Sequence, residues 1–133
     1  FNAEKGRVRG IAIAPDGQRI AATYEKPVII LWRADGTVLN TIPEKAREVV
    51  FSRDGQTLVA AMDDTTVRLW NRDGKPLATL KGHQDRVMSV AISPDGRWIA
   101  SAGNDNSIKL WSMDGRLIRT FTGHRKPIWK VVF

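Results

Sequence analysis

The stretch HQDRVMSVAISPDGRWIASAGNDNSIKLWSMDG, from His83 to Gly115, decides the fold. It contains the apolar runs VMSVAIS, WIASA and IKLW, and a polar turn follows each run. Glycine in an Asp-Gly turn can adopt the positive φ that a tight hairpin requires. The stretch therefore predicts consecutive antiparallel strands that form one unit of a β-sheet.

The same pattern occurs three times along the chain. A Pro-Asp-Gly or Arg-Asp-Gly turn begins at residues 15, 53 and 94, and the set Trp-x-x-Asp-Gly begins at Trp32, Trp70 and Trp111. Both series are separated by 38 and then by 41 residues. Two independent markers that keep one register indicate internal repeats.

Each repeat predicts four strands, and no segment has the length and the 3.6-residue period of a helix. The predicted strands are residues 11–14, 19–23, 28–32 and 38–42, then 49–52, 57–62, 67–70 and 76–80, then 90–93, 98–102, 108–111 and 117–121. Because residues 121–133 align with residues 1–13, the first strand of a fourth unit is predicted at 128–133. The sequence thus predicts an all-β fold with three four-stranded antiparallel units plus an extra strand.

Composition places the chain in the range of a single globular domain over residues 1–133, with 42% apolar and 26% charged residues. It contains no apolar run of 18 residues, and its first ten residues lack the apolar segment of a signal peptide. We therefore expect a cytoplasmic protein. The absence of cysteine excludes a disulfide framework, a thiolate metal site and a cysteine nucleophile.

The chain is strongly basic, with 21 Lys and Arg against 14 Asp and Glu and a formal net charge of +7. Such a charge attracts acidic surfaces or nucleic acid. Most of the basic residues are spread singly along the chain, however. A functional basic face and a charge that serves only solubility both remain open.

The residues GH, SPDG, IASAGND and IKLW, read in this order, resemble the WD-repeat β-propeller family, and the resemblance covers the whole chain. It implies four-stranded blades around a channel, here over residues 8–42, 46–80 and 87–121. It also implies a non-catalytic module for protein interaction or scaffolding, without a cofactor. The Trp-Asp dipeptide of the family is replaced by Trp-Arg, Trp-Asn and Trp-Ser, and the tandem units resemble the WD arrays of large bacterial multidomain proteins.

Four residues of the third repeat match the structural hydrogen-bond relay of that family: His83, Ser101, Asp105 and Trp111. The resemblance implies that Asp105 pairs with His83, His83 with Ser101, and Ser101 with the indole N–H of Trp111. Such a chain satisfies polar groups that are buried. The other two repeats are incomplete, because alanine replaces the serine in both and the loop histidine is absent, with Glu4 at that position in the first.

A catalytic interpretation of the same residues is not favoured. No Gly-x-Ser-x-Gly elbow surrounds Ser101, so a hydrolase is not indicated. His83 and His124 occupy equivalent positions of successive repeats and do not predict a shared metal site. The turn aspartates lack calcium-loop spacing. We expect no enzyme activity and no metal.

The resemblance places a partner-binding rim at the loops before each first strand and between each second and third strand. The candidate rim residues are Arg7, Arg9, Lys45, Arg47, Asp63, Arg86, Met88, Asn104 and Trp129, with Glu25 and Lys126 nearby. Arginine beside an exposed aromatic residue suits an acidic or phosphorylated protein partner. Nucleic acid is the alternative ligand, and solvated charges with an ordinarily packed Trp129 are the non-functional interpretation.

Three blades cannot close a ring, since propellers have about four to eight. The chain, which begins at Phe1, is therefore expected to be a segment of a larger WD-repeat protein. The other interpretation is that identical chains complete a propeller together, with residues 128–133 pairing with another subunit.

Overall fold

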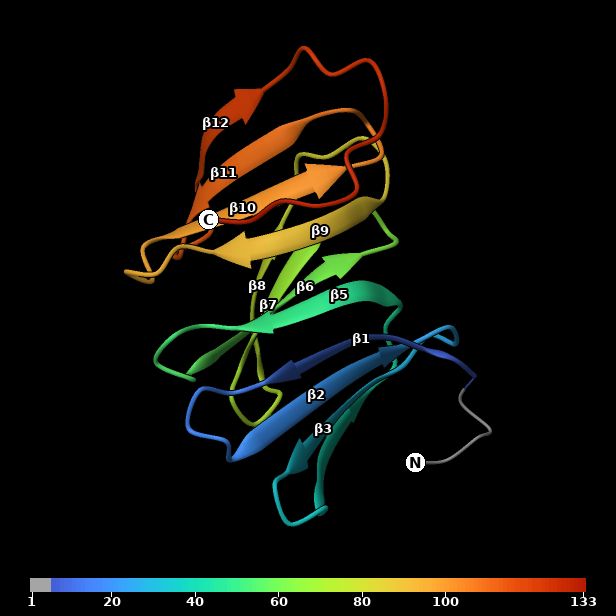
Figure 1. Ribbon diagram of the computed structural model, residues 1–133, viewed down its shortest axis with the longest axis vertical. Helices are drawn as coiled ribbons and strands as arrows, with labels where there is room; N and C mark the ends of the chain where they lie inside the picture. The colour runs from blue at the N-terminus through green and yellow to red at the C-terminus, as the bar shows by residue number, and fades with distance from the viewer. Residues whose placement is uncertain (1–5) are drawn as a thin grey trace.

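The computed structural model describes residues 6–133, which form twelve β-strands and no helix. The strands make three four-stranded antiparallel sheets that follow one another along the chain (Figure 1). Each sheet is a simple meander in which consecutive strands pair. The predicted all-β fold class is confirmed.

The strand bounds are as follows. The first sheet contains β1 (Val8–Ile13), β2 (Arg19–Tyr24), β3 (Ile29–Arg33) and β4 (Val38–Ile42). The second sheet contains β5 (Ala46–Phe51), β6 (Thr57–Met62), β7 (Val67–Asn71) and β8 (Pro76–Leu80). The third sheet contains β9 (Val87–Ile92), β10 (Trp98–Gly103), β11 (Ile108–Ser112) and β12 (Leu117–Phe121).

The first strand of each sheet begins three residues before the predicted start at residue 11, 49 or 90. The pairing register shifts between Val8 and Gly10 in β1 and between Ala46 and Glu48 in β5. Such a bulge puts an extra residue into the strand and interrupts the alternation of side chains. The polar residues Arg9 and Arg47 lie at these irregularities and interrupt the apolar pattern at the starts of β1 and β5.

The turns between first and second strands are fixed by short side-chain hydrogen bonds. In the third sheet, Asp95 accepts a hydrogen bond from the Ser93 hydroxyl at 2.6 Å and from the Arg97 N–H at 3.0 Å, and Gly96 has a φ of 72°. The hydrogen bond from Ser93, followed by that from Arg97, lowers the pKa of Asp95. This aspartate is a turn former, as the sequence predicted.

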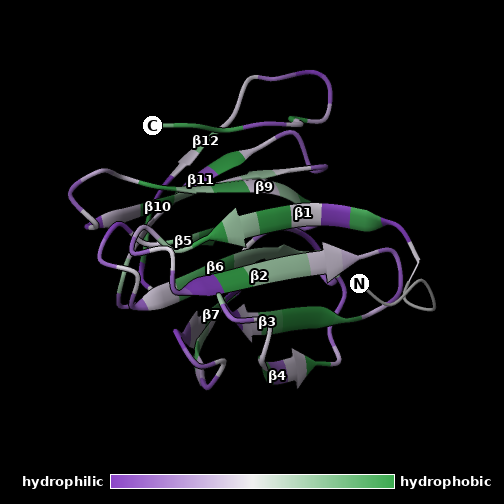
Figure 2. Cartoon of the chain, turned by 60° about the horizontal axis from the view of Figure 1, so that its bottom comes forward, coloured by the Kyte–Doolittle hydropathy of each residue, from purple (hydrophilic) through white to green (hydrophobic). Residues whose placement is uncertain are grey.

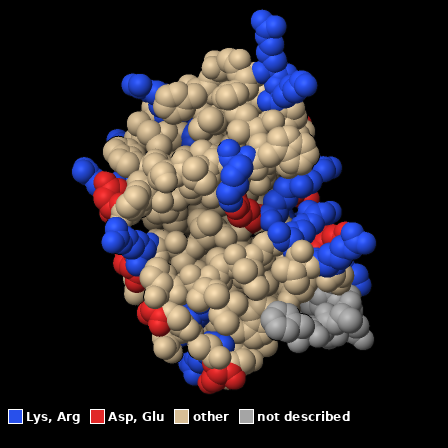
Figure 3. Space-filling view, viewed as in Figure 1, with Lys and Arg blue, Asp and Glu red and all other residues tan. Residues whose placement is uncertain are grey.

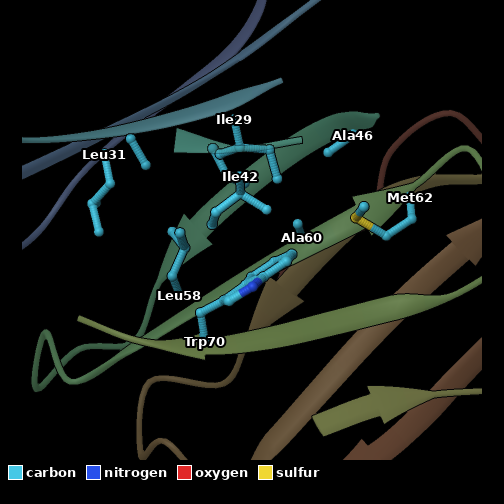
Figure 4. Packing of buried hydrophobic residues seen from close by; sticks show 10 residues of the cluster. Ile29, Leu31, Ile42, Ala46, Leu58, Ala60, Met62 and Trp70 are labelled. Carbon is cyan, nitrogen blue, oxygen red and sulfur yellow. The ribbon is translucent and has the colours of Figure 1, made fainter. Parts of the chain in front are cut away.

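The core lies between neighbouring sheets. Between the first two sheets, Ile29, Leu31 and Ile42 face Leu58 and Trp70 (Figure 4). A second cluster joins the second and third sheets, and its members are Val59, Ala61, Val67, Leu69, Leu80, Val87, Val90, Ile99 and Trp111. The sheets therefore stack face to face, and each buries apolar side chains against the next.

Strands carry most of the apolar residues, and the connecting turns are hydrophilic (Figure 2). Not all of these apolar side chains are buried: on one face of β1, Ile11 and Ile13 are 55% and 60% exposed. Among the described residues, no helix is long and apolar enough to cross a membrane.

Residues 128–133 form no strand. The backbone N–H of Ile128 donates to the Gly103 carbonyl at 3.3 Å, and that of Val131 donates to the Ser89 hydroxyl at 3.2 Å. Each first strand of the three sheets pairs with a second strand of its own unit. No such second strand is present for 128–133 within residues 6–133, so the extra strand predicted there is not formed in this structure.

Candidate functional site

The four residues of the predicted relay lie within hydrogen-bonding distance of one another. His83 Nδ1 is 2.9 Å from Asp105 Oδ2, and His83 Nε2 is 2.7 Å from Ser101 Oγ. Trp111 Nε1 donates to the same hydroxyl oxygen at 2.8 Å. His83 comes from the loop before β9, Ser101 from β10, Asp105 from the turn after β10 and Trp111 from β11. The relay therefore joins two strands and two loops of the third sheet.

The protonation of the relay follows from its surroundings. Burial lowers the pKa of His83, and this outweighs the opposite influence of the Asp105 carboxylate, so the imidazole is neutral at pH 7. A neutral imidazole donates from one nitrogen and accepts at the other. His83 then donates to Asp105 and accepts from Ser101, while Ser101 accepts from Trp111. Both ring nitrogens of His83, the Ser101 hydroxyl and the Trp111 indole N–H thus all have partners.

Asp105 is the most strongly hydrogen-bonded member. Burial raises its pKa, but hydrogen bonds from the Gln84 N–H at 2.9 Å, the Ser107 hydroxyl at 2.8 Å and His83 outweigh burial and lower the pKa to about 2. The carboxylate is therefore charged at neutral pH. It ties the loop before β9 to the turn between β10 and β11.

The second candidate feature, here called the Asp63 cluster, consists of Arg9, Lys45, Arg47 and Asp63. Arg9 Nη1 is 3.3 Å and Lys45 Nζ is 3.7 Å from Asp63 Oδ2, and Arg47 Nε is 3.2 Å from Asp63 Oδ1. The cations come from the first two sheets, so the cluster crosses their junction. Three positive charges surround one negative charge, which leaves a net charge of +2.

Beside this cluster lies a groove of about 770 Å³ along the first strands of the sheets. Its lining includes the predicted rim residues Arg9, Arg47, Met88 and Trp129. Trp129 is 71% exposed, which contradicts the interpretation of this residue as ordinary packing. Figure 3 shows Lys and Arg side chains gathered with a few acidic ones at the right-hand edge, where β1, β5 and β9 begin.

The remaining rim residues are separate from the Asp63 cluster. The backbone N–H of Arg7 donates to Glu25 at 3.5 Å. The backbone of Arg86 and the side chain of Asn104 bind Asp85, at 2.7 Å and 2.8 Å, and Lys126 is exposed. Glu4, the position equivalent to the loop histidine in the first repeat, lies outside the described residues. The predicted rim thus divides into distinct patches.

The family assignment follows from a comparison with family models. The model described as "WD domain, G-beta repeat" matches residues 36–71 and 74–112, which together are more than half of the chain. The chain belongs to the WD40 repeat family. Each match begins just before a fourth strand and continues through the third strand of the next sheet. The three sheets are therefore WD40 blades.

Solved structures support the WD40 fold. The chain is similar to the structure titled "Crystal structure of RRP9 WD40 repeats", with a TM-score of 0.89 and 22% identity over 94% of this chain and 41% of that chain. The structure titled "Structure of U3-55K" matches with the same TM-score and identity, over 94% of this chain and 42% of that chain. The chain thus spans about two fifths of each. A comparison with curated proteins found no match.

WD40 domains generally mediate protein interaction or scaffolding and are typically not enzymes. The geometry of the relay agrees with this, because Ser101 is 0% exposed and already holds both His83 and Trp111. A substrate cannot reach its hydroxyl in this conformation. Among the described residues, no group of three or more His, Asp or Glu side chains could hold a metal ion.

Sequence reasoning missed several residues around these WD40 sites. An added Cβ at Gly103 would lie 2.6 Å from His83 Nδ1 and 2.5 Å from Asp105 Oδ1, so the relay needs a glycine here. The equivalent residues of the other blades are Tyr24 and Met62, which are large and buried. This difference between repeats is visible in the sequence and could have identified Gly103. Glu48, which lines the groove, gave no comparable signal.

Proposed function

We propose that this WD40 segment is a non-catalytic interaction module that binds an acidic segment of a protein partner. The binding site is the Asp63 cluster together with the adjoining groove. The observation that carries the proposal is the convergence of Arg9, Lys45 and Arg47 on the single carboxylate of Asp63.

The charge of the cluster favours an anionic ligand. A single carboxylate neutralises one of the three cations, and the exposed fractions of the Arg9, Lys45 and Arg47 side chains are 25%, 45% and 29%. Arginine can bind a carboxylate with two parallel hydrogen bonds, which adds both energy and geometric specificity. Carboxylates of a partner can therefore bind here without leaving a buried charge unpaired.

The groove supplies the apolar part of the site. Ile11, Ile13 and Phe51 line it next to Arg9 and Arg47. Since Ile11 and Ile13 are more than half exposed, an apolar side chain of a ligand would cover them favourably. The expected ligand is therefore a peptide that places an acidic residue near Asp63 and an apolar residue a few positions away.

Binding can be tested with a short labelled peptide that contains several Glu residues and one Phe, measured by fluorescence anisotropy. The double variant Arg9→Glu and Arg47→Glu should weaken binding by about tenfold or more, since each tenfold loss corresponds to about 1.4 kcal/mol. The matched control is Arg33→Glu with Arg97→Glu, which makes the same charge change at two exposed residues outside the groove lining, one at the end of β3 and one in the turn before β10. Equal losses of affinity in both double variants would mean that the peptide responds to the net charge of the protein and does not bind in the groove.

Nucleic acid is the alternative ligand. The net charge of +7 permits it, and the exposed Trp129 in the groove can stack on a base, but Trp70 and Trp111 are buried in the blades and cannot. A single-stranded oligonucleotide that binds more tightly than the peptide, with a steep loss of affinity as salt increases, would replace the proposal by nucleic-acid binding.

A further inference from the structure

The contacts that hold the Asp63 cluster together are long, and each uses a single nitrogen. The distance to the Asp63 carboxylate is 3.3 Å from Arg9, 3.7 Å from Lys45 and 3.2 Å from Arg47. Strong hydrogen bonds between a charged nitrogen and a carboxylate are about 2.7 to 2.9 Å long, and the most specific arginine pairs use two nitrogens. Asp63 therefore lies at the centre of three cations without binding any of them tightly.

Most donors of the two arginines are not used inside the cluster. Arg9 binds Asp63 through Nη1, and Arg47 binds it through Nε. Among residues 6–133, the other guanidinium nitrogens of these two arginines have no hydrogen-bond acceptor. Since a guanidinium has five N–H donors in a planar fork, each arginine can bind a second carboxylate and still keep its contact with Asp63.

The backbone, and not only the carboxylate, holds Asp63 in place. The Asp63 N–H donates to the Lys45 carbonyl at 3.0 Å. Asn104 of the third blade, 41 residues later, makes the equivalent bond to the Arg86 carbonyl at 2.8 Å. A neutral asparagine is therefore compatible with the backbone at this position, and the charge of Asp63 is not needed to form the turn.

We propose that Asp63 is an internal competitor of the acidic ligand and limits the affinity of the site. Its side chain is 14% exposed, whereas the side chains of the three cations are 25% to 45% exposed. A ligand carboxylate therefore reaches the cations from solvent and comes to lie beside a second negative charge, which repels it. This inference rests on the proposed function, because it concerns the regulation of the same site.

The Asp63 carboxylate also has an opposite effect, because it orders three long side chains before the ligand arrives. Such ordering raises affinity, since the ligand need not immobilise the side chains itself. With single contacts of 3.2 to 3.7 Å, however, the carboxylate orders these side chains only weakly. Repulsion of the ligand is therefore the larger effect, and removal of the charge should strengthen binding.

The first test uses the acidic peptide described above and the variant Asp63→Asn. The amide keeps the shape of the side chain and can still accept a hydrogen bond, but it carries no charge. We expect Asp63→Asn to bind the peptide about tenfold more tightly than the wild type, which corresponds to about 1.4 kcal/mol. Asp63→Ser, a second neutral replacement, should also bind more tightly, and Asp63→Glu, which keeps the charge, should not.

The matched control is Asp73→Asn, which removes the same charge from the turn at the opposite end of β7. Asp73 forms an ion pair with Arg19 at 3.2 Å, and its side chain is 60% exposed. This variant should change the affinity for the peptide much less than Asp63→Asn does. The comparison separates the local charge of the site from the net charge of the protein.

Inorganic phosphate provides a second test that needs no peptide. An anion that binds the folded protein raises its Tm as the anion concentration increases. Because Asp63→Asn leaves three cations without a countercharge, phosphate should raise its Tm more than it raises the Tm of the wild type. The difference should disappear when Arg9→Glu and Arg47→Glu are added. Sodium chloride at equal ionic strength is the control for screening of charges.

The two tests distinguish failure of this inference from failure of the proposed function. Weaker peptide binding by Asp63→Asn would overturn the inference, because Asp63 would then act by ordering the cations. Equal gains in Asp63→Asn and Asp73→Asn would also overturn it, because the effect would come from net charge. If neither the wild type nor any variant binds the peptide, the proposed function fails and phosphate decides: equal Tm shifts in the wild type and Asp63→Asn would refute the inference.

Discussion

Replacing Asp105 by alanine should destabilise the third blade by about 2 kcal/mol. The carboxylate holds His83 at 2.9 Å, the Gln84 N–H at 2.9 Å and the Ser107 hydroxyl at 2.8 Å. Without it the buried Nδ1–H of His83 loses its acceptor, and a buried donor without a partner costs about 1 to 3 kcal/mol. Ser107 Oγ, 3.4 Å from Nδ1, can recover part of this loss after a small shift.

The pKa of Asp105 gives a second estimate of this magnitude. Although burial opposes it, hydrogen bonding in the folded state lowers the pKa of Asp105 from 3.8 to about 2, and its side chain is 11% exposed. A difference of this size corresponds to about 2 kcal/mol of stability carried by the ionised carboxylate. Because the folded-state pKa is lowered, this contribution is complete above pH 3.8 and is lost as the pH falls toward about 2. Asp105→Ala should lack this part of the acid dependence.

Urea and thermal unfolding at pH 7, followed by tryptophan fluorescence, measure the effect. A loss of about 2 kcal/mol lowers Tm by roughly 6 to 10 °C for a domain of this size. The control is Asp35→Ala, since Asp35 is an exposed turn residue whose carboxylate accepts from the Thr37 N–H at 2.9 Å. A Tm shift of Asp105→Ala no larger than that of Asp35→Ala would refute the structural role proposed for the relay.

Further outcomes concern the neighbours of Asp105. Gly103→Ala should destabilise the protein by about 2 kcal/mol or more, because the new methyl group would lie 2.6 Å from His83 Nδ1 and must push the relay apart. Ser101→Ala should cost about 1 to 3 kcal/mol in urea unfolding, since it removes the shared partner of His83 and Trp111. Combining Ser101→Ala with Asp105→Ala should cost less than the sum of the two, because both break one network. Additive losses would contradict a coupled relay.

The repeat pattern predicts the fold because the same three sequence features recur at the same positions of each repeat. Asp-Gly turns mark the hairpins, alternating apolar residues mark the strands, and one tryptophan marks each third strand. The starts of β1 and β5 were missed because Arg9 and Arg47 interrupt the alternation at a bulge. A bulge depends on pairing with the partner strand, and the sequence of one strand does not express it.

The candidate sites differ in how far they could be anticipated. The four relay residues follow from the resemblance to the WD-repeat family, and their hydrogen bonds have the order that the resemblance implies. The rim residues were predicted as a single set, but Arg9, Lys45 and Arg47 converge on Asp63 while Arg86 lies with Asp85. The difference depends on how adjacent sheets are rotated and stacked. One sequence without its tertiary contacts cannot supply that information.

The residues at one equivalent position, Met62 in the second blade and Gly103 in the third, explain why the third blade has the relay and the second does not. A side chain at this position in β10 would occupy the space of the imidazole. In the second blade, Met62 is 1% exposed there, and the loop before β5 has no histidine. Each blade must fill the same internal space, either with one large apolar side chain or with a histidine that brings a glycine, a serine and an aspartate with it. A histidine introduced before β5 would therefore destabilise the second blade unless Met62 were replaced by glycine at the same time.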